Sequence, residues 1–381
     1  MEQNNAPLRK YTVWQLRKLL KKKSLAWQIF IHTFAAVGFA LIAAWALYQT
    51  GITNDPGSVD KNSRQMASYT SRIDTSSAAT IAKQQFQSQL DLIILNKLYP
   101  TNARLISEAS KYGDCPDAID RMIHVLLPYM QEEGKDEIYQ QMMKTAYSTI
   151  NGFKTKTTQK NVIPWMNDSS WSYMQRALVA DKEAFEKAAK ITGVDARLII
   201  ACTVGEQIRL CNSNREGIKR ALGPATMMVN SQFSFGVNGI KDFTAQQTER
   251  NLKNSKSPFY MGKQYEKILD FSTEDIENER IQRLTNSKDH LYSYIYTGCI
   301  LHQCMLQWKR AGFDVSDRPD ILFTLFNLGF GYSKPHANPQ CGGANISIGG
   351  RVYTFGAICN DFFYSGALTK EFPLHAKNFK E

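Results

Sequence analysis

The spacing of apolar residues divides the chain into one continuous apolar run and a series of amphipathic segments. Residues 25–48 (LAWQIFIHTFAAVGFALIAAWALY) contain no Asp, Glu, Lys or Arg. A helix of that length rises about 36 Å at ~1.5 Å per residue, enough to cross the hydrocarbon core of a bilayer. Beyond a polar stretch rich in Ser, Thr, Asn and Gly, residues 81–150 repeat apolar positions at helical spacing. The pattern predicts a transmembrane helix, a linker and a helical region.

The second half of the chain carries stronger helical signals. Asp195 precedes an apolar stretch and is typical of a helix N-cap. A strongly apolar helix is predicted over 290–312, and another over 318–331 with Pro319 in its first turn. Residues 344–356 alternate around Gly349-Gly350, which predicts a β-hairpin. The expected fold is therefore mainly α with a small C-terminal β-hairpin.

The predicted organisation has five parts. These are a basic cytoplasmic tail at 1–24, a transmembrane helix at 25–48, a linker at 49–80, a helical spacer or docking region at 81–150, and a helical domain at 165–381 that ends in the hairpin.

The positive charge of the chain is placed unevenly. The net charge is +11, and residues 1–24 hold seven Lys or Arg against one acid, Glu2. A basic segment beside an apolar span predicts a cytoplasmic N-terminus with the rest of the chain outside. A cleaved signal peptide is the alternative, since Ala44-Trp45-Ala46 fits a cleavage site, but the apolar run exceeds the ~7–15 residues usual for such signals. The same adjacency favours membrane anchoring over nucleic-acid binding, so no nucleic-acid partner is predicted.

The cysteines define neither a metal site nor a disulfide pattern. Seven occur, all beyond the apolar run, and none falls in a CxxC or Cys/His spacing. No metal and no cofactor is therefore predicted. In an oxidising space one to three disulfides would fit the count, although Cys299 and Cys304 fall on different sides of their helix and do not suit one another.

The stretch DARLIIACTVGEQIRLCN, residues 195–212, places a carboxylate in an apolar helix. Glu206 follows seven uncharged, mostly apolar residues. Cys202 and Thr203 lie on its helical face, and an apolar setting keeps a carboxyl protonated, as a general acid requires. The alternative is an ion pair with Arg209, three residues on. On this helix alone the ion pair is the simpler interpretation.

Three later segments change that balance. After the glutamate helix come an LGPATMMV loop, a helix containing Gly298, and a helix ending TLFNLG, in that order. The series resembles the lysozyme-like family of lytic transglycosylases and goose-type lysozymes, over about residues 170–335. Gln207 stands where the family usually has Ser, and no Gln ends the second motif.

The resemblance implies an α-rich lysozyme-like catalytic domain in which Glu206 is the catalytic glutamate. The candidate substrate-binding residues are Gly223, Met227, Ser231, Gln232, Tyr296, Phe326 and Asn327. A hydrolase needs a second carboxylate. Asp242, Glu249 and Asp361 are available, and each is interpreted as a solvated surface charge. Family transglycosylases use a single glutamate, first as acid and then as base, so the lack of an evident partner favours that reaction.

These features together predict a peptidoglycan-cleaving enzyme of a bacterial envelope, cutting the β-1,4 bond between MurNAc and GlcNAc. It would be a single-pass inner-membrane protein with a periplasmic catalytic domain. The predicted partners are peptidoglycan glycan strands, the inner membrane through residues 25–48, and an envelope or secretion-machine protein through residues 81–150. The alternatives are a hydrolysing lysozyme and a non-catalytic glycan-binding scaffold.

Overall fold

The computed structural model describes residues 27, 30–33, 78–144, 156–212 and 234–380, with the backbone alone for 78–87, 143–144 and 234–235. The chain forms two compact units, Met1–Asp55 and Pro56–Glu381. Among the described residues no helix is both long enough and apolar enough to cross a membrane. The predicted span at 25–48 falls almost wholly outside the described residues, as do the predicted tail and most of the linker.

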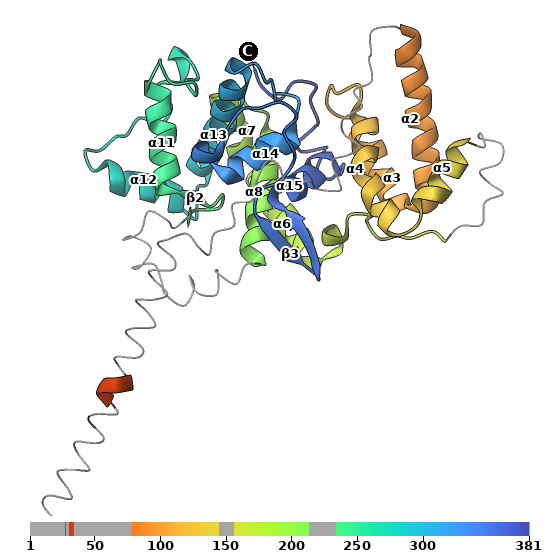
Figure 1. Cartoon of the computed structure of the whole chain (residues 1–381), viewed down its shortest axis with the longest axis horizontal. Coiled ribbons are helices and arrows are strands. Elements are labelled where there is room, and N and C mark those ends of the chain that lie inside the picture. Colours follow the sequence, from red (N-terminus) through yellow and green to blue (C-terminus); the bar gives the residue numbers. More distant parts are fainter. Residues whose placement is uncertain (1–26, 28–29, 34–77, 145–155, 213–233, 381) are drawn as a thin grey trace, which may run out of the picture. The chain divides into compact units, whose positions relative to one another are not determined.

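The described part of the second unit is mainly helical, as the sequence predicts, and carries two short antiparallel hairpins (Figure 1). Its elements, in chain order, are α2 (Ala78–Leu98), α3 (Pro100–Ala109), α4 (Ala118–Glu132), α5 (Asp136–Lys144), η2 (Pro164–Asn167), α6 (Ser169–Ala180), α7 (Lys182–Thr192), α8 (Ala196–Cys211), β1 (Ser234–Phe235), β2 (Ile240–Lys241), α11 (Asp242–Lys253), η3 (Lys263–Tyr265), α12 (Ile276–Thr285), α13 (Leu291–Arg310), α14 (Pro319–Leu328), η4 (Phe330–Tyr332), β3 (Asn345–Ile348), β4 (Arg351–Thr354) and α15 (Phe355–Tyr364).

Helix α8 lies in the core. Most of its length is buried, from Arg197 to Glu206 without a break, and it contacts α7, α13, α14 and α15 (Figure 1). A helix that is apolar on all sides must be covered on all sides. The prediction that Asp195 caps this helix is confirmed, because its carboxylate accepts a hydrogen bond from the backbone N–H of Arg197 at 2.7 Å.

The predicted C-terminal hairpin is confirmed. β3 and β4 pair antiparallel, and the pair Ile348–Arg351 closes on a two-residue turn. The turn residues Gly349 and Gly350 have φ of 56° and 82°. Two consecutive positive φ values are what a tight hairpin turn requires, and glycine adopts them without a steric penalty.

Arg197 joins α8 to the C-terminal part of the chain. Its guanidinium is fully buried and donates to four backbone carbonyls: Phe363 at 2.8 Å, Phe372 at 2.8 Å, Ala367 at 2.9 Å and Phe362 at 3.2 Å. Two of these carbonyls belong to the last turn of α15, where the helix itself provides no donors. Burial lowers the pKa of Arg197 to about 10, which still leaves it charged at neutral pH. The arginine therefore caps one helix from within another.

Helix α4, in the region 78–144, packs directly against α15. The hydroxyl of Tyr129 on α4 donates to Asp361 at 2.5 Å, and the indole N–H of Trp165 donates to the same carboxylate oxygen at 3.2 Å. Arg121 on α4 binds Asp317 at 2.9 Å and the hydroxyl of Tyr364 at 3.2 Å. Burial raises the pKa of Asp361 to about 7, against the opposing effect of the two hydrogen bonds. The region predicted as a spacer belongs to the same compact unit as the rest.

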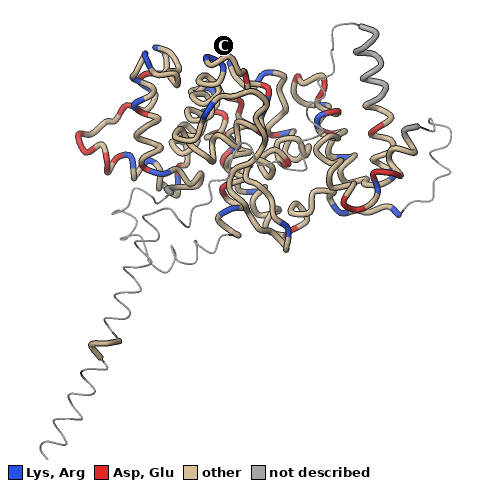
Figure 2. Tube along the Cα trace, viewed as in Figure 1, with Lys and Arg blue, Asp and Glu red and all other residues tan. Residues whose placement is uncertain are grey.

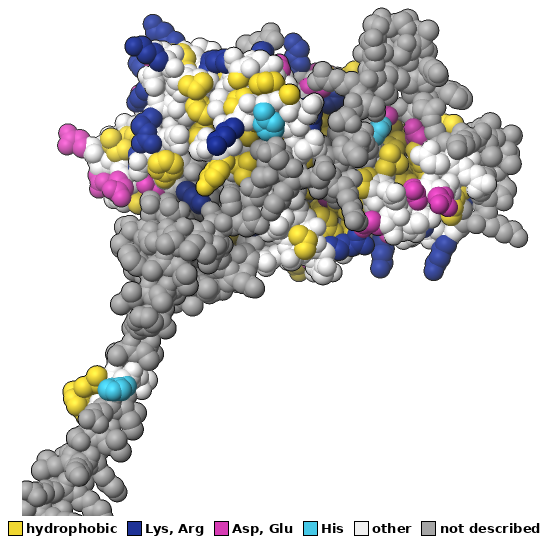
Figure 3. Space-filling view, viewed as in Figure 1, with side chains coloured by type: hydrophobic (Ala, Val, Ile, Leu, Met, Phe, Trp, Pro, Cys, Tyr) yellow, Lys and Arg dark blue, Asp and Glu magenta, His cyan; other side chains and the backbone are white. Residues whose placement is uncertain are grey.

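In helices α11, α12 and α13, acidic residues lie near the start of a helix or basic residues near its end (Figure 2). The first turn of α12 holds Glu277 and Glu279. The last turns of α11 and α13 hold basic residues, among them Lys253 and Arg310. In Figure 3, acidic side chains accordingly gather over α12 and basic ones over α11 and α13. Acids near helix N-termini and bases near C-termini complement the helix dipole, so local helix stabilisation accounts for this arrangement.

The role of Arg197 can be tested by replacing it with Met, which fills similar space without donors. Four buried carbonyls then lose their partners, and each unsatisfied group costs ~1–3 kcal/mol. We expect the free energy of unfolding to fall by about 3 kcal/mol or more, measured on the full chain by denaturant titration. Arg104 is exposed, so Arg104→Met should change stability by less than ~0.5 kcal/mol. Equal stabilities for the two variants would contradict the capping role.

The buried Asp361 predicts a particular pH dependence. Its folded pKa of about 7 exceeds the unfolded value of 3.8, so the native state holds the proton more tightly. Protonation of Asp361 therefore contributes in full to the free energy of unfolding below pH ~4, and this contribution is lost as the pH rises to about 7. Asp361→Asn cannot titrate, so relative to this variant the wild type should lose about 3 kcal/mol between pH 4 and pH 8. Thermal unfolding across that range measures the difference, and the exposed-site variant Glu274→Gln should track the wild type.

Candidate active site

Glu206 lies in the C-terminal half of α8 and is only 3% exposed. One of its carboxylate oxygens, Oε2, accepts hydrogen bonds from Arg209 Nη2 at 2.5 Å and Arg209 Nε at 3.0 Å. The ion pair considered from the sequence is therefore present. It differs from an ordinary surface pair because the glutamate side chain is buried, whereas that of Arg209 is 26% exposed.

A tight turn between β1 and β2 covers this carboxylate. The turn consists of Gly236, Val237, Asn238 and Gly239. Gly239 has φ of 57°, and a methyl group added to it would lie 2.5 Å from Glu206 Oε2. A glycine is needed here on two grounds, because the backbone is left-handed and because the carboxylate leaves no space for a side chain.

The turn is fastened to two helices. Gln207 on α8 donates to the carbonyl of Val237 at 2.5 Å. Asn238 is fully buried, and its amide donates to the hydroxyl of Thr297 on α13 at 2.6 Å. The other amide atom of Asn238, Oδ1, is buried and has no hydrogen-bond partner among the described residues. Gln207, which stands where the resembling family usually has Ser, thus holds the turn against α8 in this chain.

The remaining described surroundings of Glu206 are uncharged. Cys202 precedes it by one helical turn, and Cys359 of α15 packs against Gly205. Burial raises the pKa of both thiols well above the ordinary value, so they are neutral. Low polarity favours a neutral carboxyl, whereas a bound guanidinium favours the ionised form. The site therefore combines two opposing influences on one acid.

Several residues predicted to contact substrate occupy other environments. Tyr296 is fully buried, and its hydroxyl donates to Glu249 at 2.6 Å. Phe326 is buried and stacks on Phe355. Both side chains are enclosed by the packing of their helices, and their predicted contact with substrate stays a prediction. Gly223, Met227, Ser231 and Gln232 lie outside the described residues.

Asn327 is half-buried and holds the chain ahead of the C-terminal hairpin. Its Oδ1 accepts a hydrogen bond from the backbone N–H of Ala344 at 2.8 Å. Gly343 lies against the same oxygen, since an added methyl group would approach it to 2.9 Å. The asparagine thus has a structural contact at the end of α14, and its predicted contact with a sugar stays a prediction.

The three carboxylates considered as partners of Glu206 are engaged elsewhere. Arg280 binds Glu249 through two hydrogen bonds, at 2.6 and 2.7 Å, and Asp242 at 3.3 Å. Asp361 is buried beside Tyr129. The interpretation of Asp361 as a solvated surface charge is wrong, because it lies at the packed junction of α4 and α15. No second acid is therefore placed beside Glu206 among the described residues.

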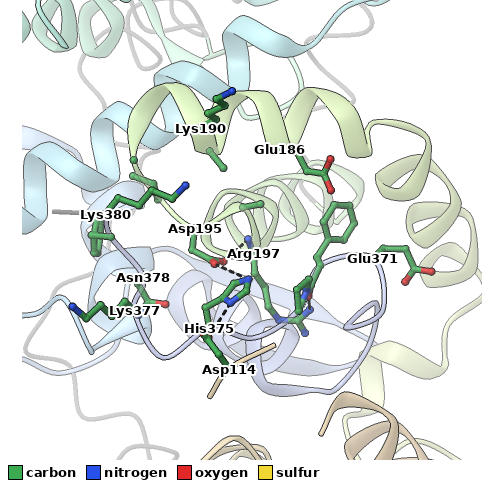
Figure 4. A pocket seen from close by; sticks show the side chains of 17 residues that line it. Asp114, Glu186, Lys190, Asp195, Arg197, Glu371, His375, Lys377, Asn378 and Lys380 are labelled. Atoms are coloured by element: carbon green, nitrogen blue, oxygen red, sulfur yellow. Dashed lines mark hydrogen bonds and ion pairs between the residues drawn. The ribbon is translucent and has the colours of Figure 1, made fainter. Parts of the chain in front are cut away.

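A pocket lies at the start of α8, about 16 Å from Glu206 along the helix. This pocket has a volume of about 750 Å³ and is lined by α7, the start of α8 and the C-terminal segment (Figure 4). His375 binds Asp114 at 2.9 Å and lies 4.0 Å from Asp195. Burial raises the pKa of Asp195 to about 6, and His375 opposes that shift. The labelled lysine side chains in Figure 4 do not converge on one point.

All seven cysteines are free thiols, so the structure contains no disulfide among them. Cys211 is exposed on the last turn of α8, where it borders a small pocket of about 120 Å³ together with Trp165 and Trp171. Among the described residues no group of three or more His, Cys, Asp or Glu side chains could hold a metal ion.

Comparison of the chain with models of known protein families, with curated proteins and with solved structures finds no match.

The close approach of Gly239 to Glu206 gives a direct test of the covering turn. Gly239→Ala places a methyl group against the carboxylate, so we expect a loss of about 2–4 kcal/mol in unfolding free energy from strain and overpacking. Gly349 has a similar φ but open space around it, so Gly349→Ala carries the backbone strain alone. A difference of less than ~0.5 kcal/mol between the two variants, measured by denaturant titration, would contradict the crowding.

Proposed function

We propose that the protein is a membrane-anchored peptidoglycan-cleaving enzyme, a lytic transglycosylase that uses Glu206 as its general acid and base. The observation that carries the proposal is the position of Glu206, a buried carboxyl in an otherwise uncharged stretch of core helix. Buried carboxylates are rare unless they are paired or have a chemical role. The resemblance to lysozyme-like enzymes over residues 170–335 adds the expected order of the surrounding segments.

The proposed reaction needs one carboxyl and no water. Protonated Glu206 donates its proton to the oxygen between MurNAc and GlcNAc, and the bond from that oxygen to the MurNAc anomeric carbon breaks. The carboxylate then accepts the proton of the MurNAc 6-hydroxyl, whose oxygen bonds to the same carbon and closes an anhydro ring. Glu206 is thus protonated both at the start and at the end of the bond-breaking and ring-closing steps. This sequence agrees with the engagement of Asp242, Glu249 and Asp361 in other contacts.

The proposed location rests on the sequence. The uncharged run at 25–48 and the basic tail before it are those of a single-pass inner-membrane anchor with a cytoplasmic N-terminus. The catalytic part would then face the periplasm and its glycan strands. Helices α2–α5 would be available to an envelope or secretion-machine partner on the side away from the contact between α4 and α15.

A non-catalytic scaffold is the second candidate, and a specific observation favours it. Glu206 is covered by the Gly236–Gly239 turn and bound by Arg209, an arrangement that a purely structural ion pair would also produce. In that case the domain would bind glycan strands or an envelope partner without cutting them. A hydrolysing lysozyme is a variant of the first proposal in which water takes the place of the 6-hydroxyl.

Digestion of purified cell walls distinguishes these candidates. The full chain in detergent should release soluble fragments from dye-labelled peptidoglycan, and Glu206→Gln should lower the rate at least ~100-fold because the amide cannot donate a proton. Glu183 is exposed on α7, so Glu183→Gln is the matched control and should digest at the wild-type rate. Equal digestion by wild type and Glu206→Gln would refute the catalytic assignment. Binding of walls without digestion by either protein would favour the scaffold.

A further inference from the structure

The two hydrogen bonds from Arg209 converge on a single carboxylate oxygen of Glu206. A guanidinium fork usually spreads over both oxygens of a carboxylate. Here Nε and Nη2 both reach Oε2, the same oxygen that faces Gly239. One atom of the proposed acid is thus held by an arginine and covered by a backbone turn at the same time.

Among the described residues, Arg209 is the charged group at hydrogen-bond distance from Glu206. From α8 and α15 the titratable neighbours are the thiols of Cys202 and Cys359, which are neutral. The covering turn has no charged residue, and α13 contributes the hydroxyl of Thr297 through Asn238. A cation at hydrogen-bond distance favours the ionised carboxylate. A general acid needs the opposite state when it meets its substrate.

The burial of the Glu206 carboxyl is a second reason why the ion pair must open before reaction. A proton donor must come within ~2.6–3.2 Å of the leaving oxygen, yet the Glu206 side chain is 5% exposed and Oε2 is covered. The side chain of Arg209 is 26% exposed and borders solvent, whereas that of Glu206 is buried. Of the two groups on Oε2, the arginine is the one that can leave without unfolding the turn.

We infer that Arg209 is a positioning residue that keeps Glu206 as a covered carboxylate in the resting site, and that a bound glycan strand must separate the pair so that Glu206 takes up a proton from water before it donates one to the substrate. This inference rests on the proposed function. The pair then restrains the enzyme in the absence of correctly seated substrate. Once the bond is cut, re-formation of the pair stabilises the carboxylate.

The test follows the protonation of Glu206 and the digestion of walls separately, on the full chain. Carbon-13 NMR of glutamate-labelled protein, with Glu206→Gln to assign the signal, gives the pH at which Glu206 takes up a proton. In Arg209→Met that pH should rise by about 1–3 units, and wall digestion at pH 7 should increase about tenfold with its pH profile displaced upward. Arg209→Lys keeps a charge and should fall between Arg209→Met and the wild type.

Arg176 provides the matched control, since it is exposed on α6 and contacts the ring of Tyr173. Arg176→Met removes the same charge and should alter neither the Glu206 signal nor digestion. An unchanged Glu206 signal in Arg209→Met would overturn the inference, as would a loss of digestion with an unchanged pH profile. If the signal moves but no variant digests walls, the hold on the carboxylate is supported and the proposed function fails.

Discussion

The burial of α8 on every side is the constraint on which the rest of this structure depends. A helix without a polar face has to be enclosed, and α7, α13, α14 and α15 provide the enclosure. Its two charged side chains in the buried stretch each need compensation there. Arg197, near the start, donates hydrogen bonds to four backbone carbonyls. Glu206, near the end, accepts hydrogen bonds from the guanidinium of Arg209. The first charge secures the C-terminal segment to the core, and the second is placed where the core meets the Gly236–Gly239 turn.

The surroundings of Glu206 suit the two halves of the proposed reaction unequally. Uncharged neighbours and exclusion of water favour the protonated carboxyl that must act first. Arg209 favours the carboxylate that must accept a proton afterwards. A single glutamate that serves first as acid and then as base must be protonated at one stage and ionised at the next. An arginine that can bind or release the carboxyl is consistent with one glutamate in both roles. A scaffold has no such need, and for it the pair would be permanent.

Features fixed by neighbouring residues could be predicted from the sequence, whereas those fixed by distant packing could not. The cap at Asp195, the first-turn position of Pro319 and the Gly349-Gly350 turn follow local rules, and all three are confirmed. The burial of Tyr296 and of Asp361 does not follow from local rules, because their hydrogen-bond partners are 47 and 232 residues away. In the site, the ion pair of Glu206 with Arg209 could be predicted, because the two residues are one helical turn apart. The contacts of the Gly236–Gly239 turn with Gln207 and Thr297 could not be predicted, because they join residues 30 and 59 positions apart.

The central claim is that this chain cuts glycan strands without water, and the mass of the products tests it most directly. Peptidoglycan digested by the full chain in oxygen-18 water should yield fragments that end in an anhydro ring and contain no heavy oxygen. Fragments that each gain one heavy oxygen would show hydrolysis. The absence of any fragment that depends on Glu206 would contradict the account altogether.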